Sequence, residues 1–191
     1  MSDKKVGIIT VHRNVNYGAN LQAFASCKFI NNAGYNAEII DYYPPEIDKD
    51  NYLFSWLKLS YDGGKSKLLQ HNLKLVAALV LSAPDKNNRL KNFYNFRKTH
   101  CKLSPKYTDL KDIANGDYTD VVCGSDQIWN PDITKGINPL YFGDIPGAKN
   151  KISYAASLGR DKYKEIDEQK AAELIKKWIM YRCVKKSLSN T

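Results

Sequence analysis

Three short strings hold most of the residues of this chain that could take part in chemistry. They are NYGANLQAFA (16–25), GSDQIWNP (124–131) and SYAASLG (153–159), and each of them ends or follows a run typical of a buried strand. A turn requires a glycine and an aspartate or proline, but it does not require glutamine and tryptophan as well. Because residues beyond the strand ends of open α/β sheets build ligand sites, we expect these strings to form one.

Two residues in or beside these strings are candidates for acid–base catalysis. His12 follows the first predicted strand and is a residue type suited to proton transfer near neutral pH, but a capping or loop role explains it about equally well. Asp126 stands just beyond the apolar run at 120–123, where it is suited to proton transfer or, alternatively, to capping a helical turn. We favour a functional role for Asp126 and for its neighbour Gln127.

The residues around them are suited to binding a polar substrate. Arg13 is the main fixed cation near the strand ends, and Gly18 allows the backbone to approach a phosphate or carboxylate. For Trp129 we favour a place in the core under its loop, and for Ser157 packing is an equally good interpretation. The predicted substrate-binding residues are Arg13, Asn16, Tyr17, Gly18, Asn20, Gln22, Gly124, Ser125, Gln127, Trp129, Asn130 and Ser157.

The composition indicates one globular domain with a sizeable core. The chain has 191 residues, of which 43% are hydrophobic and 12% aromatic. Its four cysteines are scattered without paired spacing, and no histidine stands at metal-ligand spacing from them, so we expect neither a metal site nor a disulfide framework. Reduced thiols fit a cytoplasmic protein best.

The net charge of +9 raises the question of anionic partners. The basic residues are spread along the chain and are not interleaved with aromatic ones, so we expect a solvated lysine-rich surface and no nucleic-acid partner. A small anionic substrate remains compatible. The apolar run at 75–81 is far shorter than the about 20 residues of a membrane-crossing helix. We therefore expect no transmembrane segment and interpret this run as part of a core or docking helix.

Alternating strand and helix patterns predict the fold. The expected strands are 6–11, 36–43, 120–123 and 151–156, and the expected helices are 19–33, 109–114 and 163–178. The face of the first helix expected to be buried carries Leu21, Phe24, Ala25, Phe29 and Ile30. Residues from about 46 to 104 are expected to form a helical insertion in which Pro84 separates two helices. The pattern predicts an α/β fold, a Rossmann-like parallel sheet with flanking helices and this insertion.

Taken together and in this order, the motifs resemble the polysaccharide pyruvyl transferase family. The resemblance runs from Lys5 to about Lys177. Any one motif is a weak signal, whereas the ordered set is specific. The matching motifs are a GIIT strand, NYGAxLQ, an IIDYY strand end, Leu103-Ser104, GSDQxWNP, Tyr141-Phe142 and SYAASxG.

The resemblance implies a fold similar to B-type glycosyltransferases, in which two Rossmann-like halves face each other across a cleft. Residues 1–177 would be the amino-terminal half, and the acceptor sugar would lie on it. The implied reaction moves a pyruvyl group from phosphoenolpyruvate to a sugar of a cell-surface polysaccharide, with His12 and Asp126 as acid–base candidates and no cofactor. Peripheral contact with a membrane-linked glycan is compatible with this role, and no oligomeric state is predicted.

Two other interpretations stay open at this point. The amide-rich loops would also serve a carbohydrate-binding or partner-binding module without chemistry of its own. A dinucleotide-binding domain is disfavoured, because Gly18 alone represents the three glycines that its phosphate loop requires. Asp41 occupies the ribose-binding place of such domains, but we interpret it as an acid that solvates the sheet end.

The tail at 178–191 departs from the family, which has a strand reading roughly DYVSVRE there. Permitted codons for Trp178 to Lys185, read from the last base of the tryptophan codon, encode Asp-Tyr-Val-Ser-Val-Arg-Glu. We therefore expect a frame shift just before Trp178 that has replaced the second domain, and we expect the chain alone to lack transferase turnover. Sequencing the gene beyond Lys177 tests this expectation.

Overall fold

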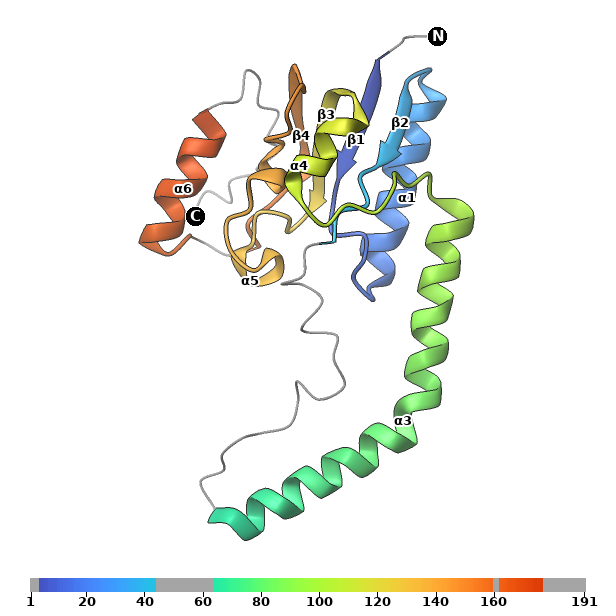
Figure 1. Ribbon diagram of the computed structural model, residues 1–191, viewed down its shortest axis with the longest axis vertical. Coiled ribbons are helices and arrows are strands. Elements are labelled where there is room, and N and C mark those ends of the chain that lie inside the picture. Colours follow the sequence, from blue (N-terminus) through green and yellow to red (C-terminus); the bar gives the residue numbers. More distant parts are fainter. Residues whose placement is uncertain (1–3, 44–63, 160–161, 177–191) are drawn as a thin grey trace, which may run out of the picture.

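The computed structural model describes residues 4–43, 64–159 and 162–176, with the exception of some side chains of the long helix. The fold is α/β, with a parallel sheet flanked by helices, as the sequence pattern predicts (Figure 1). The elements are β1 (Lys5–Ile9), α1 (Tyr17–Asn32), β2 (Asn36–Ile39), α3 (Gly64–His100), α4 (Leu110–Ile113), η2 (Ala114–Gly116), β3 (Tyr118–Asp126), α5 (Pro131–Thr134), η3 (Pro139–Phe142), β4 (Asn150–Ala156) and α6 (Glu165–Lys176).

The sheet has the strand order β2-β1-β3-β4, and all of its pairs are parallel. The chain therefore moves outward from β1 in one direction to β2 and then in the other direction to β3. Isolated parallel bridges join Ile39 to Leu103 and Tyr42 to Tyr107, so the segment after α3 lies beside β2. Because the order reverses between β1 and β3, the carboxyl ends of these two strands form the switch point at which such sheets bind ligands.

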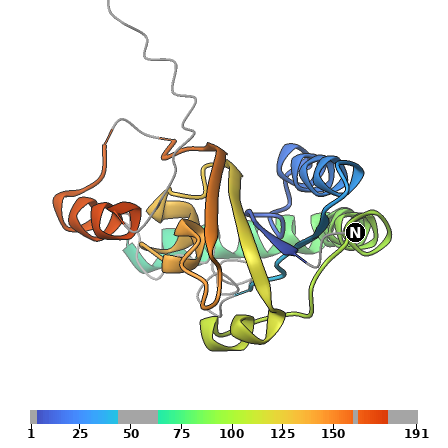
Figure 2. The same ribbon diagram turned by 90° about the horizontal axis from the view of Figure 1, so that it is seen from above.

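Apolar side chains fill the space on both faces of the sheet. On one face, Val6 and Ile8 of β1 pack against Ala23 and Cys27 of α1. The other face holds the larger cluster, which extends under α4, η3 and α6. Figure 2, which looks along the sheet from above, places α1 and α6 on different sides of the strands. This cluster contains Ile9, Val11, Ile40, Tyr107, Ile113, Tyr118, Val121, Cys123, Ile128, Leu140, Tyr141, Phe142, Ile145, Ala156 and Ala171.

The buried face of α1 differs from the predicted one. The small residues Ala19, Ala23 and Cys27 face the sheet, whereas Leu21 is 60% exposed and Phe29 is 75% exposed. Small side chains allow the helix to lie close to the strands, and the larger apolar residues then fall on the flanks. The predicted face is therefore wrong for Leu21, Ala25 and Phe29, which are exposed, whereas Ile30 packs against the core cluster on this side of the sheet.

Among the described residues of the insertion, a single helix covers the region where two were predicted. α3 runs continuously from Gly64 to His100 with Pro84 inside it, and Figure 1 shows that it is bent along its length. A proline removes one helical hydrogen bond and bends a helix, but the helix can continue beyond it. The last turns of α3 pack on α1, where the Tyr17 and Phe93 rings lie 4.7 Å apart. The predicted core role of the run at 75–81 is not seen at Val76, which is exposed.

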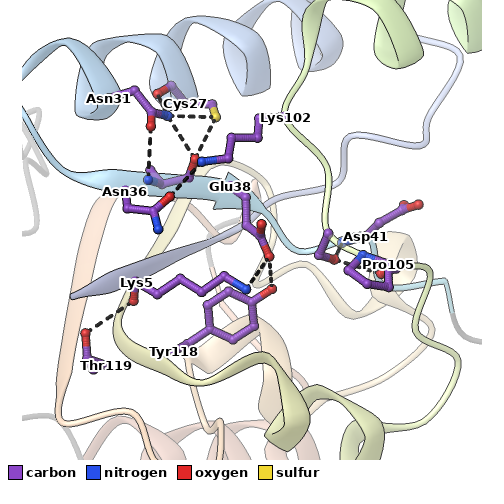
Figure 3. Close-up of polar contacts among 12 residues, drawn as sticks. Lys5, Cys27, Asn31, Asn36, Glu38, Asp41, Lys102, Pro105, Tyr118 and Thr119 are labelled. Carbon is purple, nitrogen blue, oxygen red and sulfur yellow. Dashed lines mark hydrogen bonds and ion pairs between the residues drawn. The ribbon is translucent and has the colours of Figure 1, made fainter. Parts of the chain in front are cut away.

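A polar network fixes the amino-terminal edge of the sheet (Figure 3). The buried Tyr118 hydroxyl donates a hydrogen bond of 2.6 Å to Glu38 Oε1 of β2, and Lys5 Nζ lies 3.1 Å from the same oxygen. Burial, followed by the hydrogen bond and charge of Glu38, raises the pKa of Tyr118 well above its usual range. The network thus ties β1, β2 and β3 together through side chains in addition to the backbone ladder.

Two sequence predictions lie outside the described residues. They are the atypical tail at 178–191 and the first part of the insertion, at 44–63. Among the described helices, none combines the length and the apolar character needed to cross a membrane.

Candidate functional site

The carboxyl ends of β1 and β3 lie side by side at the switch point of the sheet. Ile9 of β1 is in register with Cys123 of β3. One residue further, the buried Thr10 hydroxyl donates to the Ser125 carbonyl over 3.4 Å. This contact brings the loop that carries His12 next to the loop that carries Asp126, so the segment that precedes the first string meets the second string here.

The loops that follow β3 and β4 are joined by backbone hydrogen bonds. The Ser157 amide donates to the Asp126 carbonyl over 2.9 Å, and the Trp129 amide donates to the Ser157 carbonyl over 3.2 Å. Gly159 touches Gln127 so closely that an added Cβ would lie 2.2 Å from the Gln127 side chain. The second and third strings therefore form one structural unit at the carboxyl edge of the sheet.

Asp126 is held in an unusual backbone conformation at the end of β3. Its φ of 138° is one that residues with a side chain rarely adopt, and such residues cluster at functional sites. Its Oδ1 atom accepts a 2.7 Å hydrogen bond from the Gln127 amide. Its other carboxylate oxygen makes no hydrogen bond to the described residues. Asp126 thus keeps one oxygen for a ligand.

Trp129 and Asn130 support the loop from below. The Trp129 ring stacks on Phe142 with centroids 5.7 Å apart, and its indole nitrogen donates to the Tyr141 carbonyl over 3.0 Å. Trp129 therefore packs against the core, as the favoured interpretation of the sequence has it. The buried Asn130 side chain caps α5 and donates to Gln127 Oε1 over 3.1 Å.

Most of the first string is used within its own loop. Asn16 caps α1 by accepting from the Ala19 amide over 3.1 Å. The buried Asn20 amide group donates to the Asn14 and Asn16 carbonyls over 2.7 and 2.8 Å, so it fastens the loop to the helix. Gly18 has no left-handed backbone, and Tyr17 is exposed beside α3. Within the described residues, Asn16 forms hydrogen bonds only in its own loop and helix, and none to the other two strings.

His12 lies in the interior and is joined to Asp41. Its exposed fraction is 2%. Its Nε2 atom lies 2.8 Å from Asp41 Oδ1, and its Nδ1 atom lies 3.1 Å from the Thr10 carbonyl. Because both neighbours are acceptors, only the doubly protonated imidazolium can donate to both. In this arrangement His12 has no ring nitrogen left for a substrate, so the structure places it as a support of the edge.

Asp41 is the central carboxylate of this edge. Arg13 donates to both of its oxygens, with 2.6 Å from Nε to Oδ1 and 2.5 Å from Nη2 to Oδ2. Burial alone would raise the pKa of Asp41, but the hydrogen bonds and charges of His12 and Arg13 lower it to about 2. The Asp41 amide donates to Ser104 Oγ over 2.8 Å. Asp41 is therefore an ionised group that orients two basic side chains, and not the solvating acid that the sequence indicated.

Two further cations stand near Asp41 and were missed by the sequence analysis. Arg97, near the end of α3, donates to Asn20 Oδ1 over 3.2 Å and lies within electrostatic range of Arg13 and Asp41. Lys106 Nζ lies 5.0 Å from the centre of the Tyr43 ring, over which Arg13 also lies, at 4.6 Å. Both residues lie far from β2 in the sequence. The residues next to them in the sequence do not indicate that they lie close to Asp41 and Tyr43 in the fold. Arg13 is therefore not the main cation of the edge by itself.

A groove of about 660 Å³ opens on the α1 side of β3 and β4. Gln22 and Ser125 line it and are both predicted site residues. Tyr154 contributes an exposed ring to its wall. Its remaining lining is Ala25, Ser26, Phe29, Ile30, Val122 and Ile152. The groove is mostly apolar, as small-molecule sites usually are, and Gln22, Ser26 and Ser125 contribute its polar side chains.

The described part of the chain contains no group of three His, Cys, Asp or Glu side chains arranged to hold a metal ion. No family model, curated protein or solved structure matches the chain. What the carboxyl edge does must therefore be argued from its own geometry and from the resemblance of the sequence motifs.

Proposed function

We propose that this chain acts in the transfer of a pyruvyl group from phosphoenolpyruvate to a saccharide, and that the carboxyl edge of its sheet binds the saccharide. The reaction is inferred from the resemblance of the ordered motifs. The observation that supports the proposed saccharide site is the junction of the loops after β1, β3 and β4, which the contacts of Thr10, Asp126 and Ser157 form at the switch point.

The reaction sets clear demands on a site. The methylene carbon of phosphoenolpyruvate takes up a proton, while its central carbon forms bonds to two sugar oxygens and loses its bond to the phosphate oxygen. Of the two hydroxyl protons released, one balances the proton taken up by carbon and the other leaves with phosphate. A site for this chemistry needs a base near the hydroxyls, an acid near the methylene and cations near the phosphate.

Asp126 is the described residue best placed to act as the base. It has one free carboxylate oxygen, and the loops around it hold it by backbone bonds that do not depend on a ligand. Gln127 and Ser125 flank it, and both side chains are partly exposed. We assign His12 a supporting role through Asp41, because its two ring nitrogens are already engaged.

A second candidate function is favoured by the same observation about His12. The groups described at this edge offer one available carboxylate, on Asp126, and the Gln127 side chain, of which only Oε1 is engaged, and both can form hydrogen bonds to a saccharide. They offer no free acid for the methylene carbon. A carbohydrate-binding module without chemistry of its own therefore remains the alternative.

One set of titrations separates the two functions. The full chain is titrated with phosphoenolpyruvate and with a panel of oligosaccharides, and phosphate release is then measured in the mixture. For the transferase we expect the chain to bind both phosphoenolpyruvate and saccharide, and we expect Asp126→Asn to lower any phosphate release by about 100-fold while binding is retained. The control Asp112→Asn changes an exposed aspartate of α4 and should leave both unchanged.

The other results have definite meanings. Saccharide binding by a chain that does not bind phosphoenolpyruvate identifies the binding module, whereas phosphate release contradicts the expectation that the chain alone lacks turnover. Absence of saccharide binding by the folded chain contradicts both functions. Full turnover by Asp126→Asn removes Asp126 from the mechanism.

A further inference from the structure

Basic side chains outnumber carboxylates around Asp41. We call Asp41, His12, Arg13, Arg97 and Lys106 the Asp41 cluster. Asp41 binds His12 and Arg13 directly, Arg97 lies within electrostatic range, and Lys106 shares the Tyr43 ring with Arg13. In the described part of the chain, the cluster thus contains one carboxylate, three basic side chains and a histidine.

The arginines of the cluster are partly withdrawn from water, which makes their proximity costly. The Arg13 side chain is 27% exposed, and Arg97 is of intermediate exposure. Burial, together with the positive charge of Arg13, lowers the pKa of Arg97 from its ordinary value. Partly desolvated like charges repel each other more strongly than charges in water, so the arrangement favours a further anion.

Both arginines keep hydrogen-bond donors that Asp41 and Asn20 do not use. Arg13 uses Nε and Nη2 on Asp41, which leaves Nη1 without a hydrogen bond to a described residue. Arg97 uses Nη1 on Asn20 Oδ1, which leaves Nε and Nη2 in the same condition. A guanidinium has five N–H donors in a planar fork, the geometry that matches phosphate oxygens.

We propose that Arg13, Arg97 and Lys106 bind a phosphate group at the carboxyl end of β2, with Asp41 as the residue that positions Arg13. Charge balance selects phosphate over a carboxylate. In the described part of the chain, the Asp41 cluster carries three basic side chains, Arg13, Arg97 and Lys106, and one carboxylate, and a dianion offsets more of this positive excess than a monoanion. Charge-assisted bonds from two arginines on separate elements would also fix the orientation of a tetrahedral anion.

This inference deepens the proposed function, because it names a phosphate among the groups that the edge recognises. The phosphate could belong to phosphoenolpyruvate or to a phosphorylated saccharide. The contacts are the same for both sources, so the ligands used in the experiment have to distinguish them.

The test is calorimetric titration of the full chain with inorganic phosphate, pyrophosphate and acetate, and then with phosphoenolpyruvate and a sugar 1-phosphate. We expect phosphate and pyrophosphate to bind more tightly than acetate. Arg97→Gln should weaken phosphate binding by about tenfold or more, since it removes charge-assisted hydrogen bonds. Arg97→Lys keeps the charge but loses the fork, so its loss should be smaller. The tighter of the two organic phosphates identifies the source.

Arg89→Gln is the matched control. Arg89 lies on the same helix and touches the same loop through the Val15 carbonyl, but it stacks over Tyr17 and Phe93, away from Asp41. Arg89→Gln should change the affinity for phosphate by less than about threefold, because the lost charge acts on the site only over a long distance and is screened by salt. Each variant is checked by circular dichroism, and Lys106→Gln supplies a second test from a different segment if Arg97→Gln does not fold.

Equal weakening by Arg89→Gln and Arg97→Gln would mean unspecific attraction to a basic surface and would overturn the site. Unchanged phosphate affinity in Arg97→Gln, or in Lys106→Gln if that variant has to replace it, would also overturn it, as would equal affinity for acetate and phosphate. These results are separable from the proposed function, because saccharide binding is measured with oligosaccharides that lack phosphate.

Discussion

Replacing Asp41 by asparagine should destabilise the fold strongly at neutral pH. Asp41 is buried, is the counter-charge of Arg13 and forms a hydrogen bond with His12. Asparagine retains the shape and a hydrogen-bond acceptor, but it leaves the Arg13 guanidinium without its counter-charge in a poorly solvated place. Removal of one partner from a buried ion pair costs about 3–5 kcal/mol. We expect Asp41→Asn to lie near the lower end, about 3 kcal/mol, because Arg13 retains some contact with water.

The same interaction predicts how stability depends on pH. The pKa of Asp41 falls from its ordinary value of 3.8 to about 2 in the folded chain. A carboxyl group whose pKa is lowered by folding stabilises the fold above its unfolded pKa and loses this effect as the pH falls toward its folded pKa. The shift corresponds to about 2 kcal/mol, present above about pH 4 and mostly lost by pH 2.

Urea unfolding followed by circular dichroism measures both effects. The stability gap between the wild-type chain and Asp41→Asn should be about 3 kcal/mol at pH 7 and should narrow by about 1 kcal/mol between pH 5 and pH 3. Asp112→Asn, which changes an exposed aspartate, should stay within about 0.5 kcal/mol of wild type. A gap that is absent at pH 7, or that is equal at pH 5 and pH 3, would refute the role of Asp41 as a buried counter-charge.

Two further predictions concern the edges of the sheet. Gly124→Ala should lower the free energy of unfolding by more than about 2 kcal/mol, because φ is 125° and the new Cβ would lie 2.0 Å from the Tyr154 carbonyl oxygen. Gly34→Ala, with φ of 91° and open space around the new Cβ, should lower it by about 1 kcal/mol. Equal losses of stability in urea unfolding would contradict the predicted clash. Tyr118→Phe should lower the free energy of unfolding by about 1–2 kcal/mol, because it removes the hydrogen bond to Glu38. Tyr35→Phe, on the surface, should cause no measurable change in stability. A urea midpoint equal to that of the wild-type chain for Tyr118→Phe would refute this prediction.

Local sequence patterns were sufficient to predict much of the sheet. The run of β-branched residues at 6–11 and the apolar run at 120–123 each contain a strand, because strands buried on both faces read as continuous apolar stretches. Gly34 follows the first helix with a positive φ, as its position predicts. The buried face of α1 could not be found in the same way, because close approach to the sheet selected small residues over large ones.

The candidate site was predictable only where its residues are close in sequence. The positions of Ser125, Asp126 and Gln127 after β3 follow from the strand that precedes them. The pairing of Asp41 with His12 depends on β1 and β2 being neighbours in the sheet, and the place of Arg97 depends on how the last turns of α3 meet α1. Such long-range contacts leave no periodicity or spacing in the sequence, which explains why Arg97 and Lys106 were not found.

A polar side chain can bind a ligand only with the hydrogen-bond donors and acceptors that its contacts within the protein leave unused. Asn16, Asn20 and Asn130 resemble hydroxyl-binding amides in the sequence, but each caps a helix or fastens a loop in the structure. Asp126 keeps a carboxylate oxygen, and Arg13 and Arg97 keep N–H donors. Since an internally satisfied group gains little from a ligand, a saccharide and a phosphate would be recognised by Asp126 and by the arginines, while the amides hold the edge in shape.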